Sequence, residues 1–169
     1  DVLLFSLLSP RTIVITNIAH DHPDIYPTYE DTQNLFKEFI SKLPDDGCLV
    51  FNSDNTEEEE MFLKYKPPCV SLTYGSKSTS IFQIKNVNFA NQSTHFTLNG
   101  PFGDVDKMNY KINVPGLYNV YNASAAIIAS MYGAYQLGKD AKLSKALRAY
   151  QGCKRRFEKI AEKNGILFY

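Results

Sequence analysis

Short apolar runs alternate with helical patterns in the first half of the chain, and this alternation is the strongest constraint on its fold. Residues 11–17, 48–52 and 69–73 are short and rich in β-branched and other apolar side chains, as in strands buried within a sheet. Helical spacing of Leu and Phe at residues 29–43, and an acidic segment at 57–64, predict helices between them. Strands that alternate with helices are typical of a doubly wound α/β fold with a mostly parallel sheet.

The next segment differs, because strand-like patterns follow one another without helices between them. Residues 80–89, 93–98 and 108–114 have this pattern, and Asn-Gly and Gly-Asp pairs suited to turns lie among them. Consecutive strands joined by turns are antiparallel. We therefore expect a small antiparallel β patch, separate from the parallel sheet.

Residues with known capping preferences mark the ends of the predicted helices. Thr56 is placed to cap the acidic helix, and Gly138 to end a long helix at residues 118–137 in a left-handed turn. Asp140 is placed to cap a last helix, which Gly152 ends. On that last helix the apolar side chains share one face, and they are Leu143, Ala146, Leu147 and Tyr150.

The overall composition excludes several classes of protein. Lysine plus arginine and aspartate plus glutamate both number 18, so no positive field is available to bind nucleic acid. Three widely spaced cysteines fit neither a disulfide framework nor a zinc site. No run approaches the roughly 18 apolar residues of a membrane span, and the first residues lack the features of a signal peptide. We expect a cytoplasmic protein with no nucleic-acid or membrane partner.

Two histidines and two aspartates cluster directly after the first predicted strand. His20, Asp21, His22 and Asp24 follow Asn17. In open α/β sheets, ligands bind beyond the carboxyl ends of the strands. Imidazoles and carboxylates together can hold a divalent metal, and the same groups can also satisfy the backbone of a turn. The spacing alone leaves both interpretations open.

A second cluster lies at the start of the long predicted helix. Asn119 and Asn122 are three residues apart and therefore lie on one face of the helix. An amide side chain offers both a donor and an acceptor, which an adenine edge requires. Asparagine is also a preferred helix cap, so capping is the alternative interpretation of this pair.

Three consecutive cations, Lys154, Arg155 and Arg156, follow the last predicted helix. They can compensate the helix dipole, or a fixed guanidinium among them can bind phosphate. Residues 75–79, Gly-Ser-Lys-Ser-Thr, have the composition of a phosphate-binding loop but not the order that places lysine and hydroxyl on a nucleotide. We expect a plain turn there.

Taken in order, the three clusters resemble the motifs of the Mur ligase family. The resemblance is carried by Thr16-Asn17-Ile18 with Asp21-His22, by Asn119-Val-Tyr-Asn122-Ala123 and by Arg155-Arg156-Phe157. Within the family, these motifs are most similar to those of the enzymes that join L-alanine to UDP-N-acetylmuramate. The murein tripeptide recycling ligases come next, and the stretch from Asp21 to Tyr26 leans toward them. Folylpolyglutamate ligases share the fold, but the Arg-Arg-Phe segment favours the muramyl enzymes.

The resemblance implies an ATP-dependent, ADP-forming ligase of peptidoglycan synthesis. ATP phosphorylates the muramyl carboxylate, and the amine of the amino acid then attacks the acyl phosphate, with Mg²⁺ neutralising charge in both steps. By the resemblance, His22 reaches the magnesium ion, whose other ligands should be oxygens. Asn119 and Asn122 lie at the adenine, and Arg156 contacts the phosphates and takes part in catalysis.

Three further expectations concern residues beside these. Tyr118 stands where the family commonly has histidine, and its ring can border the adenine. Arg155 is expected to face the nucleotide-sugar substrate or the domain junction, and Asn17 is assigned to substrate binding. Ala19 replaces an acidic residue that is frequent in the alanine-adding enzymes.

The family's phosphate loop and a second, acidic metal-binding segment normally precede the position of Arg11, and neither is present. We therefore expect residues 1–169 to be the central, ATP-binding domain of a longer ligase, cut on its phosphate-loop side and just before the C-terminal domain. Its partners would be the flanking domains, UDP-N-acetylmuramate and L-alanine, and it should be inactive alone. The alternative from another class is a nucleotide-binding module without catalysis.

Overall fold

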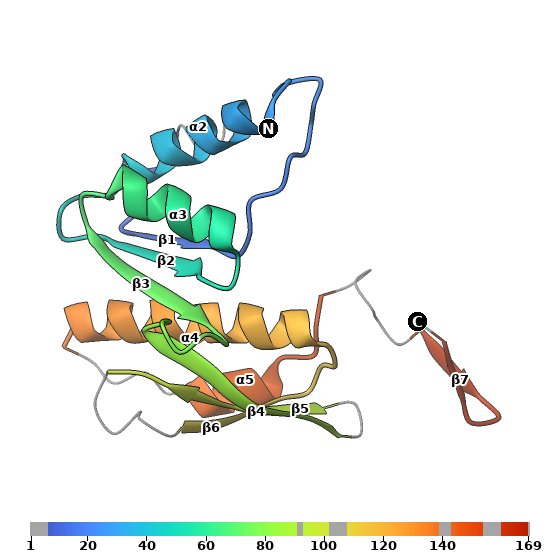
Figure 1. Cartoon of the computed structure of the whole chain (residues 1–169). Helices are drawn as coiled ribbons and strands as arrows, with labels where there is room; N and C mark the ends of the chain where they lie inside the picture. Colours follow the sequence, from blue (N-terminus) through green and yellow to red (C-terminus); the bar gives the residue numbers. More distant parts are fainter. Residues whose placement is uncertain (1–6, 91–92, 102–107, 139–142, 154–159, 169) are drawn as a thin grey trace.

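The computed structural model describes residues 7–90, 93–101, 108–138, 143–153 and 160–168, and it contains one mixed sheet (Figure 1). Each strand of this sheet lies beside its neighbours in sequence. The strands are β1 (Thr12–Ile15), β2 (Cys48–Asn52), β3 (Val70–Gly75), β4 (Phe82–Ala90), β5 (Ser93–Asn99) and β6 (Met108–Ile112). The pairs from β1 to β4 are parallel and the pairs from β4 to β6 are antiparallel, which confirms the α/β fold with an antiparallel part.

The expected separation of the antiparallel strands from the parallel sheet is wrong. Tyr74 of β3 pairs with Phe82 of β4, and Gly75 pairs with Gln83, so the sheet is continuous. β4 starts beside the end of β3 and runs in the same direction, and a short loop is therefore enough to connect two parallel strands. Strand periodicity reports which residues face the core, but it carries no information on which strands pair.

Helices cover both faces of the sheet. α2 (Tyr29–Ile40) and α3 (Thr56–Tyr65) lie on one face, and α4 (Leu117–Gln136) and α5 (Leu143–Ala149) on the other (Figure 1). β7 (Ala161–Lys163) and β8 (Ile166–Phe168) form a two-stranded hairpin of their own. No helix in the described ranges is long and apolar enough to cross a lipid bilayer.

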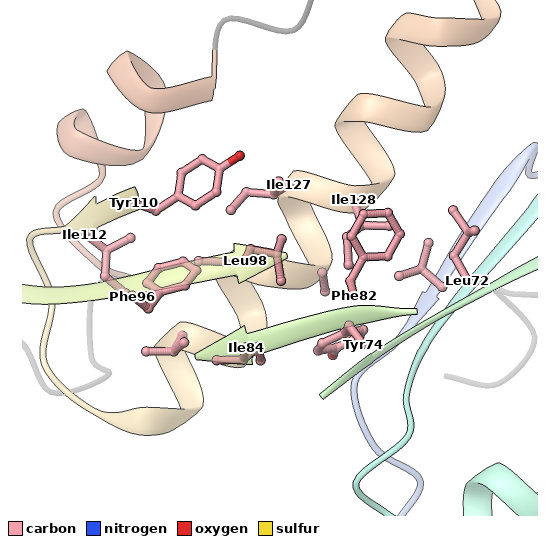
Figure 2. Close-up of a cluster of buried hydrophobic side chains, with 14 of the residues drawn as sticks. Leu72, Tyr74, Phe82, Ile84, Phe96, Leu98, Tyr110, Ile112, Ile127 and Ile128 are labelled. Carbon is pink, nitrogen blue, oxygen red and sulfur yellow. The ribbon is translucent and has the colours of Figure 1, made fainter. Parts of the chain in front are cut away.

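Alternate residues of β2 supply the two sides of the core. Leu49 and Phe51 belong to the cluster under α2 and α3, whereas Cys48 and Val50 belong to the larger cluster against α4. This explains the uninterrupted apolar sequence of β2, because a strand covered on both faces has no solvent side. Side chains of β4, β5 and β6 join the same larger cluster, as Figure 2 shows. Burial of each large apolar side chain contributes roughly 1.5–3 kcal/mol.

The helix caps agree with the sequence in one case and differ in another. Gly138 has φ of 61° and its N–H donates to the carbonyl oxygen of Tyr135, which confirms the left-handed ending of α4. The expected cap at Thr56 is wrong, because the side chain of Asn55 caps α3 and Thr56 is the first helical residue. The asparagine lies one position earlier and its oxygen accepts from two backbone amides. Asp140 lies outside the described residues.

Candidate functional site

The first turn of α4 lies at the carboxyl edge of the parallel strands. Tyr121 donates a hydrogen bond to Asp54, just beyond the end of β2, whereas Tyr132 donates to the carbonyl oxygens of Asp46 and Gly47, just before its start. α4 is therefore antiparallel to β2, and in Figure 1 its first residues lie on the side of the β2 and β3 arrowheads. This edge of an open α/β sheet is where ligands bind.

Asn119 and Asn122 face a small cavity at this edge. Its volume is about 120 Å³, and it is lined by Val114, Pro115, Tyr118, Asn119, Asn122, Tyr150, Gly152 and Cys153. A more apolar cavity of about 370 Å³ adjoins it and extends between α4 and α5. Both asparagines line both cavities, as do Val114 and Tyr150. The expected shared face of α5 is confirmed for Leu143, Ala146 and Leu147, which line the larger cavity, and Tyr150 lines it from just after the helix.

The capping interpretation of the two asparagines is wrong. α4 follows Gly116, which has φ of 101°, and no side chain caps it among the described residues. The amide nitrogen of Asn119 instead donates to the carbonyl oxygen of Pro115 at 2.6 Å. Asn122 is exposed, and within the described residues its side chain makes no hydrogen bond. The Asn122 amide therefore keeps a donor and an acceptor for a ligand.

Tyr118 borders the smaller cavity with an exposed ring. The residue is 56% exposed and its ring lies over Gly116, where an added Cβ would come within 2.6 Å of the tyrosine Cε1. Both this contact and the positive φ require glycine at that position. The ring of Tyr118 therefore lies close to the backbone of Gly116 and is exposed enough at the cavity to contact an aromatic ligand.

The histidine cluster after β1 forms a turn in which the two imidazoles differ. Nε2 of His20 lies 2.8 Å from the carbonyl oxygen of Tyr26, so this ring is used within the turn. His22 has φ of 56°, and its backbone N–H donates to the Asp21 carboxylate at 2.8 Å. The His22 side chain is 64% exposed, and its Nε2 lies 3.8 Å from Asp21. Among the described residues, one ring nitrogen of His20 is engaged within the turn, whereas neither ring nitrogen of His22 makes a hydrogen bond.

The metal and turn interpretations of this cluster now differ in support. In the described part of the chain, no group of at least three His, Cys, Asp or Glu side chains is placed to hold a metal ion. The carboxylate of Asp21 accepts from the backbone of the turn, whereas the side chain of Asp24 makes no hydrogen bond or ion pair with the described residues. Asn17 is exposed directly after β1. His22 could supply one metal ligand, and the described residues do not complete a site around it.

Glu58 is an important residue of this edge that the sequence analysis missed. It is 0% exposed, and its Oε1 accepts hydrogen bonds from the backbone N–H of Ile18 at 2.5 Å and from the Asn55 amide at 2.8 Å. Burial raises the pKa of this carboxyl. The acidic run of α3 had the appearance of a solvated face, but Glu58 and Phe62 are four residues apart and therefore share the buried side.

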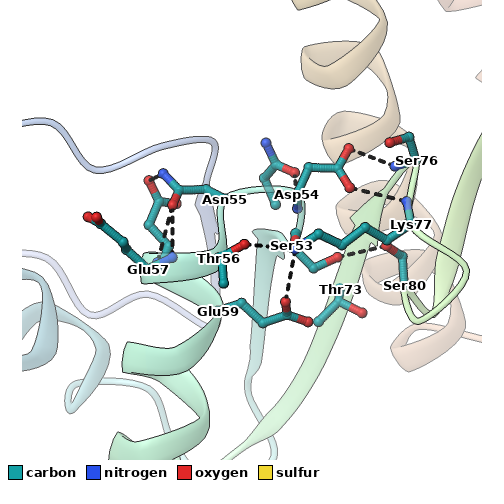
Figure 3. A network of polar contacts seen from close by, with 12 residues as sticks. Ser53, Asp54, Asn55, Thr56, Glu57, Glu59, Thr73, Ser76, Lys77 and Ser80 are labelled. Carbon is teal, nitrogen blue, oxygen red and sulfur yellow. Dashed lines mark hydrogen bonds and ion pairs between the residues drawn. The ribbon is translucent and has the colours of Figure 1, made fainter.

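Asp54 organises a second polar network, shown in Figure 3. Its carboxylate accepts from the backbone N–H groups of Ser76 at 2.7 Å and Lys77 at 3.2 Å. Residues 76–79 do form a turn, and its amide donors are already occupied by this carboxylate rather than directed at a phosphate. The Lys77 ammonium donates to the carbonyl oxygen of Ser53 at 2.7 Å and lies 3.3 Å from Glu59.

Arg155 and Arg156 lie outside the described residues.

Comparison with known proteins identifies the family. The family model of the Mur ligase middle domain matches residues 3–130. UDP-N-acetylmuramate–L-alanine ligase of Caldicellulosiruptor bescii is 31% identical over 166 residues, which cover 98% of this chain and 35% of that protein. The chain thus spans about a third of the length of such relatives.

Solved structures agree with this assignment. A MurF ligase from Thermotoga maritima in complex with ADP superimposes with a TM-score of 0.73 at 18% identity, covering 98% of this chain and 36% of that one. The UDP-N-acetylmuramate:L-alanyl-γ-D-glutamyl-meso-diaminopimelate ligase from Neisseria meningitides has a TM-score of 0.69 at 25% identity, covering 89% and 43%. The chain therefore belongs to the Mur ligase family and corresponds to its middle domain.

Proposed function

We propose that this chain is the ATP-binding domain of a ligase that joins L-alanine to UDP-N-acetylmuramate. The observation that carries the proposal is the arrangement at the start of α4, where the amide of Asn122, which no other described residue contacts by a hydrogen bond, faces a cavity bordered by Tyr118. Identity of 31% over 98% of the chain to an alanine-adding ligase supports the choice of substrates. The similar fold of an ADP-bound ligase supports a nucleotide as the ligand. A cytoplasmic location is part of this proposal, because the reaction consumes ATP and the cytoplasm supplies it.

In the proposed site each residue has a separate role. The amides of Asn119 and Asn122 recognise the adenine edge, and Tyr118 lies against the base. His22 would provide one ligand to a magnesium ion, which prefers oxygen atoms for its other ligands. Arg156 binds the ATP phosphates, while Arg155 and Asn17 serve the muramyl substrate. These roles for the arginines follow from the family motif.

The proposed reaction has two steps. A carboxylate oxygen of the muramyl substrate forms a bond to the γ-phosphorus of ATP, the bond to the β-phosphate bridge breaks, and ADP leaves. The amine nitrogen of L-alanine then attacks the acyl carbon, phosphate leaves, and the amine loses a proton. Both steps develop negative charge on phosphoryl oxygens, which cationic side chains stabilise and a bound magnesium ion would neutralise further.

Protection of Cys153 from alkylation tests the proposed nucleotide site. This exposed thiol lines the same cavity as Asn122, so bound ATP should slow its reaction with iodoacetamide. Adenosine should also protect Cys153, and GTP should protect it less. Cys48 is an internal control, because burial raises the pKa of its thiol to about 12 and it should stay unlabelled. Mass spectrometry measures the extent of labelling. Equal labelling of Cys153 with and without ATP would count against the site.

Release of ADP by the chain together with flanking domains tests the reaction. The proposal predicts release that depends on both UDP-N-acetylmuramate and L-alanine. A murein-peptide ligase is the second candidate, favoured by the 25% identity to the Neisseria enzyme, and would instead depend on the tripeptide. Nucleotide protection of Cys153 without ADP release under either condition would identify a binding module without catalysis.

A further inference from the structure

A hydrogen bond on the far side of α4 from Asn119 ties the first turns of this helix to the sheet. The hydroxyl of Tyr121 donates to Oδ2 of Asp54 at 2.5 Å. The Tyr121 ring lies against Tyr74, with 6.3 Å between the ring centroids, and Tyr74 is 0% exposed. Tyr121 is therefore held at both its ring and its hydroxyl.

Asp54 is itself held in place by the loop after β3. It accepts from the backbone amides of Ser76 and Lys77, and a Cβ at Gly75 would meet its Oδ1 at 2.5 Å. Burial works to raise the pKa of Asp54, but the hydrogen bonds from Tyr121 and from this loop keep it below its ordinary value. The carboxylate is therefore a charged, fixed acceptor, and hydrogen bonds to such acceptors are stronger than neutral ones.

The position of Tyr121 on the helix makes this contact relevant to the nucleotide cavity. Successive helical residues are separated by about 100°, so Tyr121 points nearly opposite to Asn119. A rotation of α4 that broke the contact with Asp54 would turn Asn119 and Asn122 away from the cavity. The first turn of α4 has no side-chain cap among the described residues that would resist such a rotation.

We infer that Asp54 and Tyr121 are positioning residues for adenine recognition. Neither residue lines the cavity that contains Asn122. Their hydrogen bond fixes the rotation of α4 and so pre-organises both asparagines, which lowers the cost of binding. The inference rests on the proposed function, because it assigns a determinant of affinity to the same nucleotide site.

Two tyrosine variants at opposite ends of α4 test the inference. Tyr121→Phe removes the hydroxyl that contacts Asp54, and Tyr132→Phe removes the one that contacts Asp46 and Gly47. The measurement is the ADP concentration that half-protects Cys153 from alkylation, together with the melting temperature. Tyr121→Phe should raise that concentration about three- to tenfold. Tyr132→Phe should leave that concentration unchanged. Both variants should lower the melting temperature by a similar amount, since each loses the hydrogen bonds of one tyrosine hydroxyl.

Asp54→Asn provides the second test. An amide would present a donor toward the loop amides that Asp54 accepts from, so this variant should raise the half-protecting concentration as Tyr121→Phe does. The double variant should bind no worse than Asp54→Asn alone, since the contact that Tyr121→Phe removes is already disturbed in that variant. Native-like protection in Tyr121→Phe, or equal losses in both tyrosine variants, would overturn the inference alone. If ADP did not protect the native chain, the proposed nucleotide site would fail as well.

Discussion

The backbone N–H of Ile18 donates a 2.5 Å hydrogen bond to the Glu58 carboxylate, a contact between residues 40 positions apart. It ties the loop that carries His22 to the first turn of α3. Glu58 is 0% exposed, and its Oε2 has no hydrogen-bond partner among the described residues. A buried carboxyl with one oxygen unsatisfied favours its neutral form, because desolvation destabilises the charge.

Glu58 should make the protein less stable as the pH rises. Burial raises its pKa in the folded state, so between the ordinary and the raised value the folded protein binds more protons than the unfolded one. The free energy of unfolding contributed by this group therefore falls across that interval and is lowest above it. Glu58→Gln should remove this dependence and stabilise the protein at about pH 8, where an unshifted glutamate is fully ionised. Urea denaturation at several pH values measures the effect.

Glu58→Ala is the control for that prediction. It removes the acceptor of the Ile18 N–H, so it should cost about 1–3 kcal/mol of stability at every pH. A Glu58→Gln variant that was destabilised as much as Glu58→Ala, or that kept the native pH dependence, would show that the raised pKa of Glu58 is not the source of that dependence.

Asn122→Ala should weaken nucleotide binding without changing the melting temperature. Loss of a helix cap costs about 0.5–2 kcal/mol, but Asn122 does not cap α4, so no such loss is expected. Removal of its hydrogen bonds to adenine should raise the dissociation constant for ADP roughly tenfold. Ser130→Ala, in the adjoining larger cavity, is the control and should leave binding unchanged. A melting temperature lowered as by cap loss, with native affinity, would contradict the adenine role.

His22→Asn should lower turnover and raise the magnesium requirement of the protein with its flanking domains. Asparagine tolerates the left-handed backbone of residue 22, so this exchange adds no backbone strain at that position. His20→Asn is the matched control, because His20 contacts the Tyr26 carbonyl within the turn. The readout is ADP release titrated with Mg²⁺, and an unchanged requirement in His22→Asn would count against a metal role.

Arg156→Lys should impair acyl-phosphate formation more than Arg155→Lys does. A planar guanidinium binds phosphate oxygens bidentately and an ammonium cannot, so the exchange damages a phosphate contact although the charge is kept. The measurement is acyl-phosphate formation at saturating ATP by both variants of the protein with its flanking domains. Equal or reversed losses would show that the two arginines are assigned the wrong way round.

Much of the fold could be predicted because its signals are local. β2 matches its predicted bounds of residues 48–52, since an uninterrupted apolar run is characteristic of a strand covered on both faces. Gly138 was predicted to end α4 because a left-handed residue there favours glycine. The asparagine pair was found from its helical spacing and its motif, and the structure then excluded capping.

The sequence by itself determined the strands, the main helices and the order of the motifs, because backbone preferences and side-chain periodicity act over a few residues. Only the tertiary structure decided that β4 continues the parallel sheet, that Glu58 is buried, and that Asp54 meets Tyr121 across 67 residues. Strand pairing and the burial of a charge depend on which distant segments pack together. That choice is made by the free energy of the whole core, and no short stretch of sequence contains it.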